Sequence, residues 1–307
     1  MSTNTGDAAA PQPAAYAALI AGATVWGLMW YPYRVLAAAG VDGVPGTVLT
    51  YAVAFVAGLV PFVWRRGWRG VEPSWWLALI GLSAGGCNLG YVLGTLEGEV
   101  MRVLLLFYLS PLWTVLFSRL FLGERLGLAG AGLIGLSLAG AAVMLWRPEL
   151  GAPWPAARAE WIGLVAGALF ALSNVLIRKT SELPIDAKCL AVFLGAMVLG
   201  ALLIATGVAP PPAPGPVPGA GWAIIVAVGL VLLAINLIVQ FGLTHTPANQ
   251  AIVIFLFELV VAALSSWLLA GERMGVQEWI GGAMIVAASL FSGHVSPPER
   301  KPASAAA

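Results

Sequence analysis

Glu258 is the residue whose type and position offer the most chemistry in this sequence. It lies near the middle of a long apolar segment, preceded by QAIVIFLF and followed by LVVAALSSWLLAG. A carboxyl group at the centre of a membrane helix costs about 2.5–3.5 kcal/mol on insertion scales, so it normally faces a cavity or a polar partner. We therefore expect Glu258 to bind the ammonium group of a substrate or to carry a coupling proton. A structural hydrogen bond to a neighbouring helix is the alternative.

Four uncharged amides also lie inside apolar segments. Asn88 and Asn236 are 148 residues apart, Gln240 follows Asn236 by one helical turn, and Asn174 stands in another segment. An amide both donates and accepts hydrogen bonds, which suits the two charged groups of an amino acid. The alternative is that these amides join neighbouring helices by hydrogen bonds.

Aromatic residues inside the apolar segments are the third group of candidates. Trp26 and Trp30 are four residues apart, so a helix places them on one face. An aromatic-lined cavity would suit an aromatic or bulky apolar ligand, whereas ordinary core packing is the competing interpretation. The candidate cavity-lining residues of this type are Trp26, Trp30, Tyr91, Tyr108, Phe170 and Phe257.

A fourth group of candidates could open and close a path. Glycines recur every four residues from 86 to 98, and small residues at that spacing let helices approach closely, so Gly90 and Gly94 are candidates for a sliding gate or for tight packing. Pro111 lacks an amide hydrogen and predicts a hinge within its helix. Arg34 and Arg178 end two apolar segments, where they could clamp gates by ion pairing or could bind helix carbonyls and lipid headgroups.

The composition determines which elements position these residues. Of 307 residues, 60% are hydrophobic and 9% are charged, and the mean hydropathy is +0.91, whereas soluble domains contain about 25% charged residues. A bilayer core of about 30 Å needs about 20 apolar residues per helix. The sequence thus predicts an all-α integral membrane protein with ten transmembrane helices, over residues 15–38, 44–64, 74–95, 100–121, 127–146, 160–179, 187–207, 219–243, 248–270 and 275–293.

The two halves of the chain repeat each other. A shift of 148 residues lays residues 88–125 onto 236–273 without a gap, and a shift of 144 lays Arg34 onto Arg178 and Trp26 onto Phe170. Each copy has an odd number of spans, so the second copy is inverted in the membrane. Inverted repeats around a central site are a recurring architecture of secondary transporters. We expect one five-helix repeat over 15–146 and a second, inverted one over 160–293.

The positive charges predict the orientation. With both termini in the cytoplasm, ten of the 15 Lys and Arg residues lie on the cytoplasmic side and five on the other, as the positive-inside rule favours. The alanine- and glycine-rich composition and the absence of a recognisable targeting segment suggest the plasma membrane of a bacterium. The net charge of +1 provides no basic surface for nucleic acid, so the expected partners are the lipid bilayer and a small-molecule substrate. The oligomeric state stays open, and a monomer is compatible with the sequence.

Three segments resemble a known family. VWGLMWYPYR, LFYLSPLWTVLFSRLFLGER and FELVVAALSSWLLAGER are similar to the EamA-type repeats of the drug/metabolite transporter superfamily, and the spacing of Tyr108 and Pro111 resembles the branch of YddG-like aromatic amino-acid exporters. The resemblance implies a ten-helix basket with a central cavity lined mainly by helices 1, 3, 4, 6, 8 and 9, and outward movement of small organic molecules. The second half departs from the pattern, because Glu258-Leu259 stands where the first half has Ser110-Pro111.

Other function classes lack their motifs. The sequence contains no GxxxxGK[ST] loop, no CxxC and no HExxH, so we expect neither ATP hydrolysis nor a cofactor, a metal site or catalytic residues. The sequence therefore predicts a secondary transporter that exports small amino acids or metabolites, aromatic and hydrophobic ones first, by alternating access. The alternatives are a broad-specificity drug/metabolite permease, with or without proton coupling, and, less favoured, a membrane enzyme or scaffold.

Overall fold

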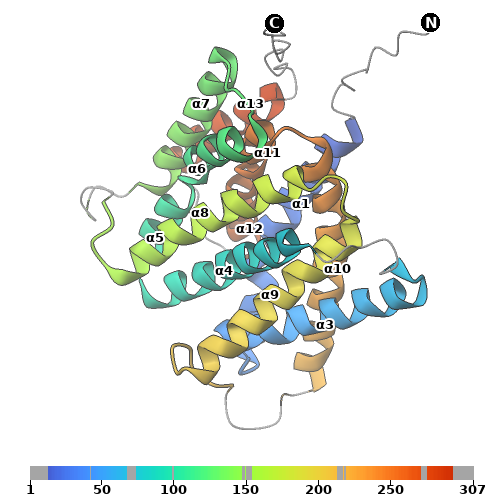
Figure 1. Cartoon of the computed structure of the whole chain (residues 1–307). Coiled ribbons are helices and arrows are strands. Elements are labelled where there is room, and N and C mark those ends of the chain that lie inside the picture. Colours follow the sequence, from blue (N-terminus) through green and yellow to red (C-terminus); the bar gives the residue numbers. More distant parts are fainter. Residues whose placement is uncertain are drawn as a thin grey trace, which may run out of the picture.

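The chain is a bundle of apolar helices (Figure 1). The computed structural model describes residues 13–41, 43–67, 74–98, 100–146, 149, 154–212, 217, 219–270 and 275–292. Within these ranges every regular element is helical, nine helical segments are long and apolar enough to cross a membrane, and Val276–Ser292 is a shorter apolar helix. The predicted all-helical fold with ten spans is confirmed.

Several spans consist of more than one helix. The first half contains α1 (Pro13–Leu28), α2 (Trp30–Ala38), α3 (Gly43–Trp64), α4 (Trp75–Glu97), α5 (Val100–Phe107), α6 (Ser110–Phe117), the π-helix η2 (Ser118–Leu122) and α7 (Leu128–Leu145). The second half contains α8 (Arg158–Lys179), α9 (Ile185–Ala205), α10 (Gly219–His245), α11 (Ala248–Phe255), α12 (Phe257–Ala270) and α13 (Val276–Ser292). The first span is therefore α1 with α2, the fourth is α5 with α6 and η2, and the ninth is α11 with α12.

Helix packing follows the internal repeat. The third span, α4, packs against α8 and α9, and its counterpart α10 packs in the same way against α1 and α3. Two further pairs, α3 with α9 and α7 with α13, each join a helix to its own counterpart. Exchanging the two halves therefore reproduces the packing, as expected for two inverted repeats that meet at a pseudo-two-fold axis.

The fourth and ninth spans break at equivalent positions. α5 ends at Phe107 and α11 ends at Phe255, which are 148 residues apart. In the fourth span Pro111 has no amide hydrogen for the carbonyl of Phe107, four residues earlier, so the helix cannot continue unchanged. The ninth span has Leu259 at the proline's position, yet Leu259 N bonds to Leu256 O at 3.1 Å and the helix is interrupted there as well. The helix interruption before Pro111 thus has a counterpart that needs no proline, and a hinge at Pro111 stays a prediction.

The first span also breaks, at Met29. Pro32 has no N–H group to donate to the carbonyl of Leu28. Met29 N donates to Trp26 O, three residues earlier, at 3.1 Å, whereas a continuous α-helix would pair it with the carbonyl of Val25. Its repeat counterpart, α8, runs from Arg158 to Lys179 without interruption. The two halves therefore share their packing but differ in the shape of this span.

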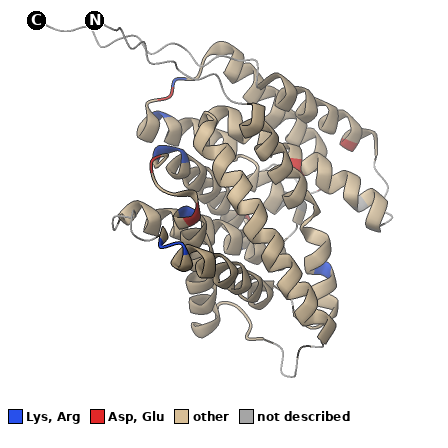
Figure 2. Ribbon diagram, turned by 90° about the vertical axis from the view of Figure 1, so that its right-hand side faces the viewer, with Lys and Arg blue, Asp and Glu red and all other residues tan. Residues whose placement is uncertain are grey.

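The outer surface is apolar. Long stretches of helix carry no Lys, Arg, Asp or Glu, and charges of both signs gather on the left of the view in Figure 2. Exposed side chains on the helices include Val60 at 64%, Leu120 at 67% and Leu268 at 70%. Apolar side chains this exposed on most spans are what contact with lipid requires, because a soluble protein rarely exposes such contiguous apolar area.

Candidate substrate site

A side-chain hydrogen bond joins the helix break of the fourth span to that of the ninth span. Tyr108 follows the last residue of α5, and Glu258 lies in the first turn of α12. The Tyr108 hydroxyl donates to Glu258 Oε1 at 2.8 Å, and the Tyr108 side chain is buried. Ser110, the repeat counterpart of Glu258, has a buried Oγ without a hydrogen-bond partner. A phenol of the first repeat and a carboxyl group of the second therefore meet at the helix breaks of the fourth and ninth spans.

A connected series of aromatic rings lies beside this pair. Phe107 makes edge-to-face contacts with Tyr91 at 5.4 Å and with Tyr108 at 5.2 Å between ring centroids. Phe170 lies 5.6 Å from Phe107 and 5.5 Å from Phe255. Phe107 and Phe255 are repeat counterparts, so Phe170 contacts equivalent residues of both halves. Sequence reasoning did not select these two phenylalanines, although their match in the repeat alignment was the available signal.

Two more of the predicted aromatics belong to the same interior, and one does not. Trp26 and Phe257 pack, partly buried, against the core that contains Phe255. Trp30 points its indole elsewhere, because its Nε1 donates to Ser265 Oγ at 2.9 Å and so joins α2 to α12. The structure thus brings Trp26, Tyr91, Tyr108, Phe170, Phe257 and Glu258 into one connected interior and leaves Trp30 at a helix–helix contact.

The predicted amides fall into two pairs. Asn88 Nδ2 donates to Ala84 O at 2.8 Å and Asn236 Nδ2 donates to Leu232 O at 2.9 Å, so both repeats make the same bond within one helix. Asn174 Nδ2 and Gln240 Oε1 are buried without a hydrogen-bond partner. A buried polar atom without a partner loses its hydration energy, so this donor and this acceptor are suited to a polar ligand group or a water molecule.

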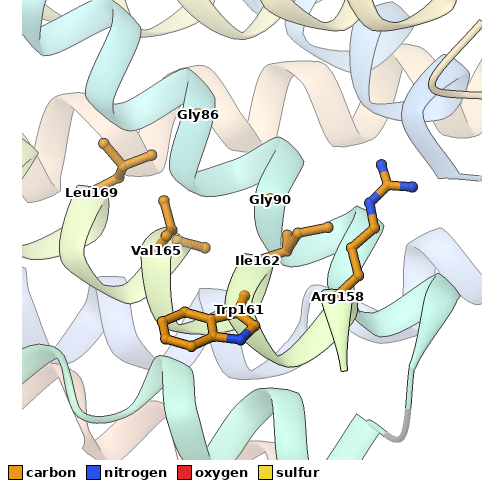
Figure 3. Close-up of a pocket in the computed structure, with 8 residues that line it drawn as sticks. Gly86, Gly90, Arg158, Trp161, Ile162, Val165 and Leu169 are labelled. Carbon is orange, nitrogen blue, oxygen red and sulfur yellow. The ribbon is translucent and has the colours of Figure 1, made fainter. Parts of the chain in front are cut away.

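The predicted gate glycines lie where α4 meets α8. A Cβ on Gly90 would stand 3.1 Å from Ala166 Cβ of α8. A Cβ on Gly94 would stand 3.3 Å from Ala159 O of α8 and 2.9 Å from Val103 Cγ1 of α5. A shallow groove of about 260 Å³ runs beside Gly90, with exposed Trp161 and Val165 on its α8 side (Figure 3). The polar candidates described above do not line it, so we assign it to the membrane-facing surface and not to the substrate site.

The two predicted gate arginines differ. Arg178 is partly buried at the end of α8 and donates to the carbonyl of Thr244, at the end of α10. Arg34 is exposed, with its guanidinium 5.8 Å from the Trp30 ring centroid. Arg178 therefore has the geometry of the carbonyl-binding alternative, which couples two helix ends of the second repeat.

This set of candidate residues has three kinds of group that a small molecule could contact. It offers a carboxyl group with a phenol beside it, flat apolar rings, and two amide atoms without partners. Within the described ranges, His, Cys, Asp and Glu side chains form no group that could hold a metal ion.

Comparison with known proteins shows a family match and, among others, two similar proteins. A model of the EamA-like transporter family matches residues 13–146 and 157–293. A riboflavin transporter of Rhizobium johnstonii is 28% identical over 263 residues, which cover 82% of each chain. A crystal structure that is 21% identical superposes with a TM-score of 0.73, covering 92% of this chain and 98% of the other. At that identity the structural likeness concerns the fold alone.

Proposed function

Because the chain belongs to the EamA-like transporter family, we propose that it exports small metabolites that carry an aromatic ring, aromatic amino acids first, by alternating access. The observation that carries this proposal is the hydrogen bond between Tyr108 and Glu258 across the two repeats, beside the rings of Phe107 and Phe170. The pair lies where both membrane spans are interrupted, which is where transporters of inverted-repeat architecture bind substrate.

Glu258 supplies the charge for recognition. Among the described residues no Lys, Arg or His forms an ion pair with it, and its hydrogen-bond donor is the neutral Tyr108. Glu258 is half-buried, and a carboxylate withdrawn from water needs a cation or a proton to compensate its charge. An amino acid brings an ammonium group for Glu258 and an aromatic ring for Phe107 and Phe170. Asn174 Nδ2 is a donor suited to its carboxylate.

Riboflavin is the second candidate substrate, because a riboflavin transporter is similar over most of both chains. Riboflavin has a large planar ring system, which the same aromatic series could stack against, but it has no ammonium group. In that case Glu258 would accept a hydrogen bond from the ligand or carry a proton, as in a proton-coupled metabolite permease.

Counterflow in proteoliposomes tests both candidates. Vesicles that contain the purified chain are loaded with unlabelled compound, and uptake of labelled tryptophan or labelled riboflavin is followed without an ion gradient, against empty vesicles. We expect saturable tryptophan exchange that phenylalanine and tyrosine compete for and that Glu258→Gln abolishes. The exposed Glu182, changed to Gln, is the matched control and should exchange normally.

The outcomes separate the candidates. Riboflavin exchange without tryptophan exchange selects the second substrate, and stimulation of that exchange by an inward pH gradient, lost in Glu258→Gln, assigns the proton to Glu258. Tryptophan exchange that Glu258→Gln leaves unchanged contradicts the assigned role of the carboxyl group. If neither compound exchanges, aromatic metabolites are not the substrates.

We also propose that both termini lie in the cytoplasm and that the membrane is the inner membrane of a bacterium. The distribution of Lys and Arg supports this orientation. It places the ends of α8 and α10, with Arg178 and Lys188, on the cytoplasmic side. A Glu182→Cys variant that lacks the two native cysteines would test this orientation, because position 182 is exposed. A membrane-impermeant thiol reagent should label it from the cytoplasmic side only.

A further inference from the structure

Polar bonds join the two repeats at the end of the bundle where α8 and α10 end and α11 begins. Lys179 Nζ of α8 donates to Phe121 O of η2 at 3.1 Å. Ser118 Oγ donates to Asn249 Oδ1 at 3.3 Å, and Asn249 Nδ2 donates to Glu124 Oε2 at 3.4 Å. Ser118, Phe121 and Glu124 belong to the first repeat, and the other two residues belong to the second. We call these five residues the polar latch.

The second repeat is itself held rigid at this end. Lys188 is fully buried, and its Nζ donates to Ile177 O at 3.3 Å, Thr180 O at 3.2 Å and Thr244 Oγ1 at 2.9 Å. Arg178 donates to Thr244 O. Both cations thus lie at helix C-termini, where the backbone dipole is negative. They fasten α8, α9 and α10 to one another behind the latch.

The acidic member of the latch matches the electrostatics of its partner helix. Glu124 accepts a hydrogen bond from the backbone N–H of Ala248, the first residue of α11, at 3.4 Å. A helix N-terminus favours a negative group, because its first N–H groups have no partner within the helix. Closing this end therefore satisfies helix-end groups of the second repeat with a carboxyl group of the first.

Among the described residues, the opposite end joins the two repeats through different and more exposed polar groups. Arg158 Nε lies 3.7 Å from Glu97 Oε2, and these two side chains are 68% and 31% exposed. The exposed Gln277 donates through Nε2 to Trp146 O at 3.0 Å. Exposed pairs of this kind contribute little stability.

The repeat alignment places Lys179 on Val35 and Asn249 on Met101. Valine and methionine cannot donate these hydrogen bonds. The counterpart of Glu124 is Glu272, which lies outside the described residues. The two ends of an otherwise repeated architecture thus differ in the chemistry that can hold them closed.

We propose that the polar latch makes the two gates unequal, so that the empty protein rests with the Lys179 end closed and the opposite end accessible. This inference rests on the proposed function, because a gate has a role only in a protein that alternates access. With the orientation proposed above, the resting protein faces away from the cytoplasm, and opening the cytoplasmic gate requires breaking the bonds of Lys179, Asn249 and Glu124.

Thiol accessibility tests the latch without any substrate. Cys87 and Cys189 are both buried and are replaced by alanine to give a background without cysteine. One reporter is Gln240→Cys, one turn inward from Thr244 on α10. The other is its repeat counterpart, Val92→Cys on α4. A membrane-impermeant methanethiosulfonate reagent is applied from the Lys179 end to the first reporter and from the opposite end to the second.

The latch predicts reciprocal changes. In Glu124→Ala and in Lys179→Met, labelling at position 240 should rise by about tenfold or more while labelling at position 92 falls, as a shift of population between two states requires. Glu182→Ala removes an exposed carboxylate at the same end and should change neither rate. A rise at both reporters would indicate a loosened protein and overturn the proposal, as would unchanged labelling at position 240. Because no substrate is added, failure here is separate from failure of counterflow.

Discussion

Gly167 of α8 allows the broken fourth span to approach the second repeat, and replacing it with alanine tests that contact. A Cβ at this position would overlap the carbonyl oxygen of Phe107 and would stand 3.0 Å from its carbonyl carbon and from its Cα. The obstructing atoms are backbone atoms, so no side-chain rotation relieves the overlap. The carbonyl concerned is the one that Pro111 leaves without its usual helical donor.

The size of the effect follows from two opposing contributions. Alanine is favoured over glycine within a helix by about 0.8–1 kcal/mol, and an overpacked methyl group costs about 1–3 kcal/mol. Gly135, in the interior of α7, has open space at its Cβ position. Gly135→Ala therefore retains only the favourable contribution, and the difference between the two variants isolates the steric cost at Gly167. We expect Gly167→Ala to be less stable than Gly135→Ala by about 1–3 kcal/mol.

Equilibrium unfolding of both variants in the same detergent measures this difference, and counterflow measures its functional effect. Displacing Phe107 from Phe170 should also weaken binding of an aromatic ligand in Gly167→Ala only. Equal stability changes in the two variants would refute the close approach of α5 to α8. A steric cost at Gly167 without any change in ligand binding would separate the helix contact from the substrate site.

Three further predictions concern single contacts. Lys188→Met should lower the free energy of unfolding by about 1.5–3 kcal/mol, since the acceptors of a charged donor lose their partner. Arg65 is an exposed cation, so Arg65→Met should leave the free energy of unfolding unchanged in the same measurement. Trp30→Phe and Ser265→Ala should each lower the free energy of unfolding by about 0.5–1.5 kcal/mol. Both substitutions remove the same hydrogen bond, so the double variant should lose less than the sum of the two. Additive losses would contradict that bond. Phe170→Leu should raise the half-saturating concentration of an aromatic ligand about 2–10-fold, the equivalent of one aromatic pair, and should leave an aliphatic competitor unaffected.

The helices and their order were predictable because a bilayer imposes a simple rule on sequence. Apolar segments of about 20 residues with charges at their ends are read directly as spans, and the repeat alignment indicated how the halves relate. Pro111 likewise predicted an interruption, since proline removes a backbone donor. The interruption at Leu256 has no such local signal. It depends on packing around α11 and α12, which sequence periodicity does not report.

Residue type and spacing identify candidate site residues in the sequence but not the contacts that these residues make. Glu258 was selected because a carboxyl group is costly in an apolar segment, but its partner Tyr108 became apparent only when both repeats were placed together. Trp30 was grouped with Trp26 because they share a helical face, yet Met29 interrupts the helix between them. Lys188 lies near a span end and was counted only as a topological charge, although its ammonium group has three acceptors inside the protein.

The mid-span position of Glu258 has an electrical consequence. A unit charge that crosses the whole membrane gains or loses about 2.3 kcal/mol per 100 mV, so a cation that reaches the middle from either side experiences about half of that. Half of this energy corresponds to about a sevenfold change in apparent affinity per 100 mV. Loading of a net cation at Glu258, either a proton or an amine without a carboxylate, would therefore respond to membrane potential. Loading of a zwitterionic amino acid or a neutral ring compound alone would not, so the voltage dependence of transport reports whether net positive charge reaches the carboxyl group.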